Sequence, residues 1–173
     1  MWVLKSKADL KDAIVDTLEM SPTDGATGMS KPIGSWDVST ITEMSELFVD
    51  EFGKAVEGAE KFNGDVSKWQ VSKVTNMERT FFSASAFNRD LSKWDVSKVT
   101  TMVGMFNSAS RFDRDLSKWD VSKVATMVGM FSFASKFNGD ISRWDVSSVT
   151  NMLACLPTRH RLTATSLSGM FPR

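Results

Sequence analysis

Acidic and basic side chains recur at a fixed interval in this 173-residue chain, and they are its clearest candidates for binding chemistry. An aspartate or a glutamine follows each of five tryptophans, and a lysine or arginine precedes four of them. Stacked carboxylates could bind calcium or a cationic partner, although neighbouring basic side chains favour a solvated face whose charges neutralise each other. We call this set the charged ladder and take it as the candidate partner-binding face. Its members are Asp37, Lys68, Gln70, Lys93, Asp95, Lys118, Asp120, Arg143 and Asp145.

A second acidic column precedes the tryptophans and has a different expected role. Short acidic side chains at the start of a turn accept backbone N–H groups, so we expect turn caps here rather than a metal site. We call these residues the cap column: Asp65, Asp90, Asp115 and Asp140.

Side chains suited to catalysis are scarce. Cys155 and His160 lie five residues apart, but no acidic residue is near them to complete a nucleophilic site. One cysteine and one histidine also exclude a disulfide framework and a histidine-rich metal centre. Regularly placed methionines are typical of core filling. The sequence therefore predicts a protein that is not an enzyme and needs no cofactor or metal.

The charged residues belong to an internal repeat. Trp69, Trp94, Trp119 and Trp144 are separated by 25 residues each, while Trp36 lies 33 residues before the first of them. A propeller blade needs roughly 40 to 45 residues, so this period favours one turn of a solenoid instead. We expect equivalent residues of neighbouring turns to lie about 4.8 Å apart, as in a parallel sheet.

Each repeat has two halves with different periods. The apolar positions of LSKWDVSKV (91–99) follow the rhythm of a leucine-rich-repeat strand, with Trp94 and Val96 facing inward. In TTMVGMFNSA (100–109) they follow a helical stripe behind Thr100, a candidate N-cap. We therefore predict an α/β repeat solenoid, a leucine-rich-repeat-like right-handed coil with a short parallel sheet on one face and short helices on the other.

Three regions follow from the extent of the repeat. Residues 1–31 are expected to form a capping helix and a linker, 32–152 a solenoid of five units, and 153–173 a divergent C-terminal cap or tail. The first unit has an insertion at 49–61, which we take either as a lengthened helix or as a second candidate binding segment. Its candidate residues are Asp50, Glu51, Phe52, Lys54 and Glu57.

Charge and hydropathy exclude several partners. Lysine plus arginine equal aspartate plus glutamate at 21 each, so no basic excess indicates nucleic acid. No apolar run is long enough for a membrane span, and MWVLKSKADL is too charged for a secretory signal.

The phrase FNGDVSKWQVSKVTNM (62–77), and more fully SKWDVSKVTTMVGMF (92–106), closely resembles the repeat of BspA-like leucine-rich surface proteins. The resemblance covers roughly 32–152. Two departures are Gln70, where the pattern has aspartate, and Thr80, where it has methionine. The resemblance implies a solenoid of cell-surface or secreted proteins that adhere to partners, with no defined catalytic residues.

Three functions remain open at this point. The first is a non-enzymatic interaction or adhesion module that binds a protein or a glycan. The second is a structural accessory subunit docked in a larger intracellular or organellar complex. The third is a surface that matches a lattice such as ice or a polysaccharide through its regular serines, threonines and aspartates.

Overall fold

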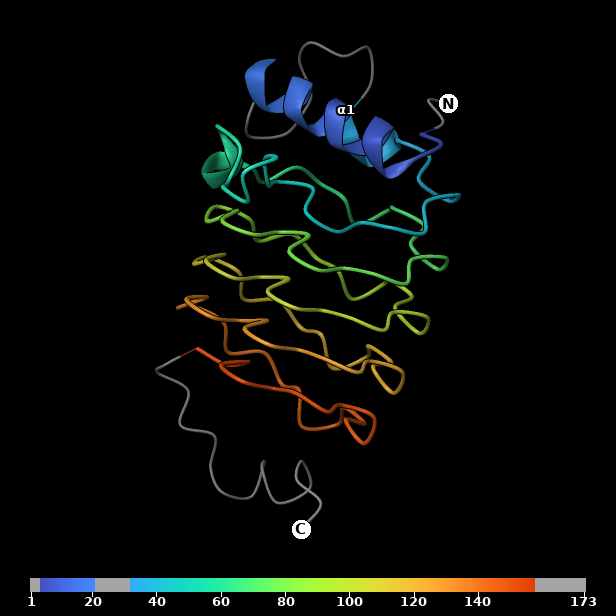
Figure 1. Cartoon of the computed structure of the whole chain (residues 1–173), viewed down its shortest axis with the longest axis vertical. Coiled ribbons are helices and arrows are strands. Elements are labelled where there is room, and N and C mark those ends of the chain that lie inside the picture. The colour runs from blue at the N-terminus through green and yellow to red at the C-terminus, as the bar shows by residue number, and fades with distance from the viewer. Residues whose placement is uncertain (1–3, 21–31, 158–173) are drawn as a thin grey trace.

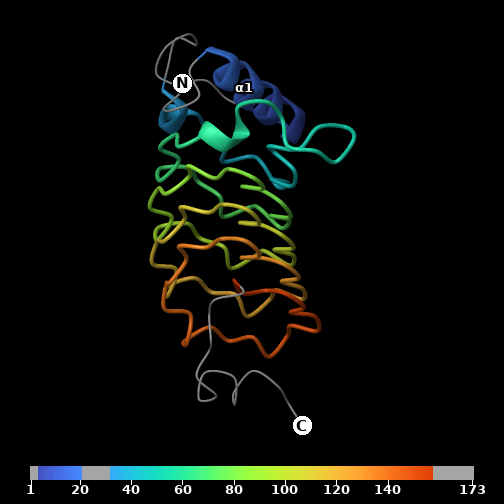
Figure 2. The same ribbon diagram turned by 90° about the vertical axis from the view of Figure 1, so that its left-hand side faces the viewer.

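The computed structural model describes residues 4–20 and 32–157. Within them the chain winds into coils stacked along one axis, and the helix α1 (Lys7–Met20) lies across the first coil (Figure 1, Figure 2). The other helical elements in these ranges are two short 3-10 helices, η1 (Ile33–Ser35) and η2 (Ala59–Lys61). The remaining residues follow turns and extended links.

The helix α1 is closed at its start by a reciprocal cap. The Ser6 hydroxyl accepts the Asp9 N–H at 3.1 Å, and the Asp9 carboxylate accepts the Ser6 N–H at 3.1 Å. Its inner face buries Leu10, Ile14 and Leu18 against the first coil. This contact removes the apolar end of the stack from water.

The predicted parallel sheet is absent from the described residues. Residues 91–99 form two consecutive turns instead of a strand, since the Trp94 N–H bonds to the Leu91 carbonyl and the Val99 N–H to the Val96 carbonyl. These N–H groups are used within their own coil and cannot form a ladder with a neighbour. Parallel β-pairing between neighbouring coils is limited to isolated bridges, at Glu43–Asn76, Asn76–Thr101, Thr101–Thr126 and Thr126–Asn151.

The predicted short helices on the other face are absent as well. Gly104 and Ser108 have φ angles of 58° and 63°, whereas an α-helix needs about −63° at every residue. Alternate N–H groups point to the next coil, as in the bonds from Gly104 to Val128 and from Phe106 to Met130, both 2.8 Å. The prediction of an α/β solenoid with a sheet and helices was therefore wrong.

The core consists of aromatic columns that run along the stack. Phe87 stacks on Phe112 with ring centroids 6.0 Å apart, and Trp69 on Trp94 at 6.4 Å. Four tryptophans, Trp69, Trp94, Trp119 and Trp144, also donate their Nε1–H to a carbonyl of the preceding coil, as Trp94 does to Val66 at 3.1 Å.

Residues that the repeat pattern assigns to the interior are buried. Six of the seven regularly placed methionines are fully buried, and Met152 in the last described coil is partly buried. The buried six are Met44, Met77, Met102, Met105, Met127 and Met130.

The insertion in the first unit forms a small loop closed by an antiparallel bridge between Val49 and Ala55, not a lengthened helix. The Asp50 carboxylate accepts the N–H groups of Phe52 and Lys54, and Gly53 turns the chain with a φ of 77°. This loop projects beyond the coils near α1 (Figure 2).

Candidate functional site

Each aspartate of the charged ladder caps the turn that follows it. Oδ1 of Asp95 accepts the Ser97 hydroxyl at 2.6 Å and the Ser97 N–H at 3.1 Å. The hydroxyl and then the N–H stabilise the carboxylate, so the pKa of Asp95 lies below its ordinary value. Asp37, Asp120 and Asp145 accept the equivalent N–H, at 3.0, 3.1 and 3.0 Å respectively.

The cap column has the role expected for it. Asp90 accepts the Ser92 N–H at 2.8 Å, and the backbone N–H and then the hydroxyl of Ser92 lower the pKa of this carboxyl group. Asp65, Asp115 and Asp140 accept the N–H two residues on in the same way. The prediction of turn caps is confirmed.

The basic members of the ladder do not pair with its aspartates. Within 4.0 Å, the described residues contain two ion pairs, Lys61–Glu60 and Arg79–Glu46. After the bonds from Ser97, the positive charge that lowers the pKa of Asp95 is that of Lys98.

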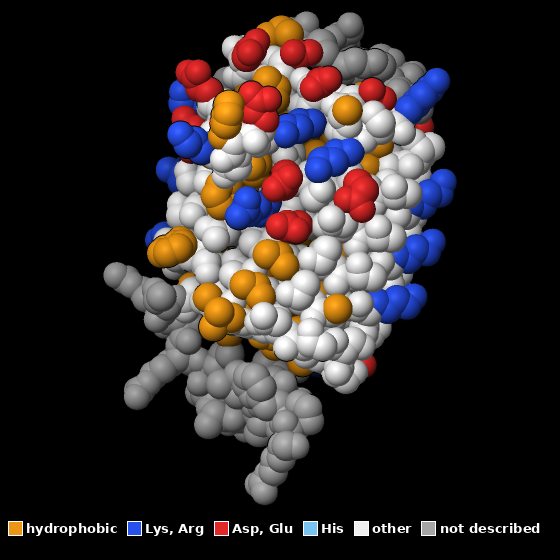
Figure 3. Space-filling model, in the orientation of Figure 1, with side chains coloured by type: hydrophobic (Ala, Val, Ile, Leu, Met, Phe, Trp, Pro, Cys, Tyr) orange, Lys and Arg blue, Asp and Glu red, His pale blue; other side chains and the backbone are white. Residues whose placement is uncertain are grey.

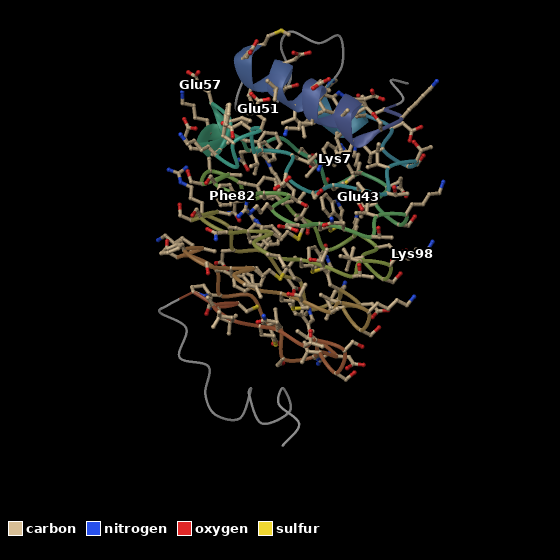
Figure 4. The ribbon with its side chains drawn as sticks, viewed as in Figure 1. Lys7, Glu43, Glu51, Glu57, Phe82 and Lys98 are labelled. Atoms are coloured by element: carbon tan, nitrogen blue, oxygen red, sulfur yellow. The ribbon has the colours of Figure 1, made fainter. Side chains whose placement is uncertain are left out.

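Lys98 belongs to a basic column that the sequence reasoning did not single out, formed by Lys73, Lys98 and Lys123 and called here the lysine column. The sequence could have revealed this column, because a lysine regularly precedes Val74, Val99 and Val124. All three lysines are exposed. Basic side chains gather along the edge of the stack (Figure 3) where Figure 4 places Lys98.

A surface concavity of about 520 Å³ brings three ladder residues together with residues of neighbouring coils. The three ladder residues in its lining are Lys68, Gln70 and Lys93. The other members of the charged ladder lie outside this lining: Asp37, Asp95, Lys118, Asp120, Arg143 and Asp145. We call it the basic concavity. The rest of its lining is Asp65, Ser67, Trp69, Asn88, Arg89, Asp90 and Arg114.

Two arginines hold fixed positions in the basic concavity. Arg89 donates its Nε–H to the Asn63 carbonyl at 2.7 Å, and Arg114 donates its own to the Asn88 carbonyl at 2.9 Å. Each bond reaches the preceding coil and leaves the terminal guanidinium N–H groups for other acceptors.

The sequence reasoning also missed these arginines, although a signal was present. The equivalent position in the flanking repeats is glycine, Gly64 before them and Gly139 after them. The arginines thus occupy a position that varies between repeats, and they lie together in space with Gln70, which departs from the repeat.

The insertion lines a separate hollow of about 510 Å³ beside α1. Glu57 is the one candidate insertion residue in that lining, together with Val15, Leu18 and Glu19 of α1. Figure 4 shows Glu51 and Glu57 on the α1 end of the stack, and Phe52 on the loop is 78% exposed.

Conventional nucleophile and metal chemistry finds no support in the described part of the chain. Cys155 is buried, and burial raises the pKa of its thiol to about 12. His160, its proposed companion, lies outside the described residues. Within 4–20 and 32–157 no group of three or more His, Cys, Asp or Glu side chains could hold a metal ion. No helix in these ranges is long and apolar enough to span a membrane.

Among known families, the chain matches the one described as Mycoplasma protein of unknown function, DUF285. The match covers residues 17–122 and, in a second alignment, 50–168. The chain belongs to this family. The overlap of the two alignments is expected for a sequence whose units repeat. No curated protein and no solved structure matched the chain.

Proposed function

We propose that this member of the DUF285 family is a non-enzymatic interaction module that binds a protein or glycan partner through the basic concavity. The observation that carries the proposal is the convergence of Lys68, Arg89, Lys93 and Arg114 in one hollow without an ion pair within 4.0 Å in the described residues. The same hollow holds the carboxylates of Asp65 and Asp90, so four cations face two anions. This excess of positive charge at a concave surface favours an external partner of complementary charge.

The position of Gln70 supports this site over the rest of the charged face. In the repeats that carry Trp94, Trp119 and Trp144, the residue after tryptophan is an aspartate that caps a turn. Gln70 has no charge, and its amide folds back toward the Lys68 carbonyl at 3.4 Å. This coil therefore lacks the ladder carboxylate, and Asp65 and Asp90 supply the negative charge in the lining.

The hydrogen bonds of the exposed threonines support a discrete binding site rather than a face that matches a lattice. The hydroxyls of Thr75, Thr100 and Thr150 donate to backbone carbonyls of the preceding coil. The protons of these hydroxyl groups are used within the stack, so they are not available to donate to an external lattice. The adhesion role and surface location implied by the BspA-like resemblance form part of the proposal.

Arrays of glycans and of cell-surface proteins, probed with the labelled intact chain, test this function. The test variant is Arg89→Gly/Arg114→Gly, which introduces the residue of the flanking repeats. The matched control is Lys98→Ser/Lys123→Ser, because the last repeat has Ser148 at that position. A ligand lost with the arginine variant and kept with the lysine variant supports the proposal. Ligands that are absent, or insensitive to the arginine pair, contradict it.

An accessory subunit is the second candidate, and the insertion favours it. Phe52 is a large apolar side chain at 78% exposure on a loop that also carries Glu51. Exposed aromatic side chains often anchor protein interfaces. Replacing Phe52 with serine should release the chain from a stoichiometric complex in size-exclusion chromatography; unchanged co-elution would count against docking through this loop.

A further inference from the structure

The lining of the basic concavity combines two kinds of hydrogen-bonding group. Lys68, Arg89, Lys93 and Arg114 supply donors with positive charge, and Asp65 and Asp90 supply carboxylate acceptors. Each carboxylate accepts one Ser N–H, from Ser67 or Ser92, which leaves further lone pairs for other donors. Their pKa values are lowered mainly by those same serines, so both remain ionised at neutral pH.

A ligand for this lining needs negative charge and hydroxyl donors together. Sulfate or carboxylate groups can accept the paired N–H groups of Arg89 and Arg114, whose Nε atoms are already fixed to the preceding coils. Hydroxyl groups can donate to Asp65 and Asp90. A purely anionic ligand would satisfy the arginines and be repelled by the two aspartates.

The apolar surface argues against a protein segment as the occupant. Protein partners are usually anchored by exposed aromatic or aliphatic side chains. The large hydrophobic side chains exposed in the described residues are Met20, Phe52, Phe133 and Leu153, and none of them lines the basic concavity. Trp69, which does line it, is only 3% exposed.

The arginine pair also suits a ligand that extends along the stack. Arg89 and Arg114 each follow a phenylalanine by two residues, and the rings of Phe87 and Phe112 lie 6.0 Å apart. Two cations in adjacent coils can therefore contact successive anionic groups of one chain-like ligand.

We propose, resting on the function proposed above, that the basic concavity binds an acidic saccharide, a sugar chain that carries sulfate or carboxylate groups together with free hydroxyls. Arg89 and Arg114 contact the anionic groups, Lys68 and Lys93 add charge at the rim, and Asp65 and Asp90 accept hydroxyl donors. Because the equivalent positions 64 and 139 are glycines, the arginines of the site are confined to two adjacent coils.

Calorimetric titration of the intact chain tests this with four probes: a heparin octasaccharide, an oligogalacturonate, a neutral dextran oligosaccharide and poly-L-glutamate. We expect one or both acidic saccharides to bind, and the pair separates sulfate from carboxylate recognition. Arg89→Gly/Arg114→Gly should weaken binding by about tenfold or more, because charge-assisted bonds are lost. Lys98→Ser/Lys123→Ser, with the same change in net charge, should weaken it by less than about threefold.

The variant Asp65→Asn/Asp90→Asn tests whether these two carboxylates accept hydroxyl groups of the ligand or only repel its negative charges. Asparagine keeps the cap oxygen but accepts hydroxyl donors less strongly, so saccharide binding should weaken while poly-L-glutamate binding strengthens. Strengthening of both would overturn the assignment, as would equal losses from the arginine and lysine variants. Binding of poly-L-glutamate or dextran at least as tight as that of the acidic sugars, or no saccharide binding, would also overturn it. If a protein or a neutral glycan bound instead, and its binding still required Arg89 and Arg114, the proposed binding function would be supported and the assignment of an acidic saccharide would be wrong.

Discussion

The thiol of Cys155 lies in the last described coil, where 4% of the residue is exposed. Desolvation penalises the thiolate and raises the pKa of this group to about 12, against an opposing contribution from a hydrogen bond with the Met130 backbone. Since the thiolate is the reactive form, burial protects this side chain from electrophiles at neutral pH. The residue therefore acts as a small apolar part of the core.

We predict that Cys155 reacts with a disulfide reagent such as DTNB only after unfolding. At pH 8 the intact chain should show no release of the coloured thiolate over minutes, and release should become complete in denaturant. A Cys155→Ala variant, which has no thiol, is the blank. Rapid release from the folded chain would show that the thiol is accessible and its pKa ordinary.

The recurring element of this molecule is a turn closed by an aspartate two residues before a serine. Asp95 with Ser97 and Asp120 with Ser122 have closely similar distances, so the turn is copied in detail from coil to coil. Each cap holds an ionised carboxylate. The folded-state pKa values of these aspartates lie below 3.8, the ordinary value of an aspartate in an unfolded chain.

We predict a stability that falls in acid. A group with a depressed folded-state pKa stabilises the fold fully above its unfolded pKa, and this contribution is lost as the pH falls through the folded-state value. The free energy of unfolding should be nearly level above about pH 5 and decrease below pH 3.8. Urea titrations monitored by tryptophan fluorescence measure it.

The control for acid sensitivity is Asp95→Asn/Asp120→Asn, which keeps the cap oxygens without the titrating charge. Its stability should be lower at neutral pH and should depend less on pH than that of the original chain. An identical pH profile for both proteins would mean that other groups cause the acid dependence.

At the scale of the whole molecule, each described coil contacts chiefly its neighbours. Thr100 bonds to Thr75 on one side, and the Ala125 N–H bonds to Thr100 on the other. In 102–108, alternate N–H groups all point toward the following coil. Each inner coil is thus bonded to the coil before it and the coil after it, and α1 covers the first coil. Stability in such a stack is approximately a sum of coil and interface contributions.

We predict that deleting residues 91–115 leaves a folded, shorter stack. The deletion removes one full period and joins Asp90 to Leu116, which restores the Asp-Leu-Ser order of the repeat. Urea unfolding should remain cooperative with a lower free energy of unfolding, because one coil interface is lost.

A deletion of residues 91–102 is the out-of-register comparison. It removes about half a period and places turn residues against the aromatic columns, so circular dichroism and fluorescence should report loss of the native structure. If both deletions unfolded the chain equally, the description of the stack as separable neighbouring coils would fail.

Much of the interior could be predicted from the sequence, because a fixed period with apolar side chains at constant places must bury those places in every turn. Trp94, Phe112 and Met102 are buried as that pattern predicts, and the cap column follows from the preference of aspartate for turns. The 25-residue interval also predicts the register between coils, as the bond from Thr100 to Thr75 shows.

The backbone conformation and the site required the tertiary structure. An apolar alternation such as Trp94 and Val96 suits two successive turns as well as it suits a strand, since both place the same side chains inward. The choice between turns and a strand depends on where each backbone N–H finds its acceptor. In 91–99 the acceptors lie within the same coil, and in 102–108 they lie largely in the next coil. The sequence by itself determined which side chains are inside and at what period. Packing between coils decided the peptide directions and brought Arg89 and Arg114 together with Gln70, because these residues meet only across the stack.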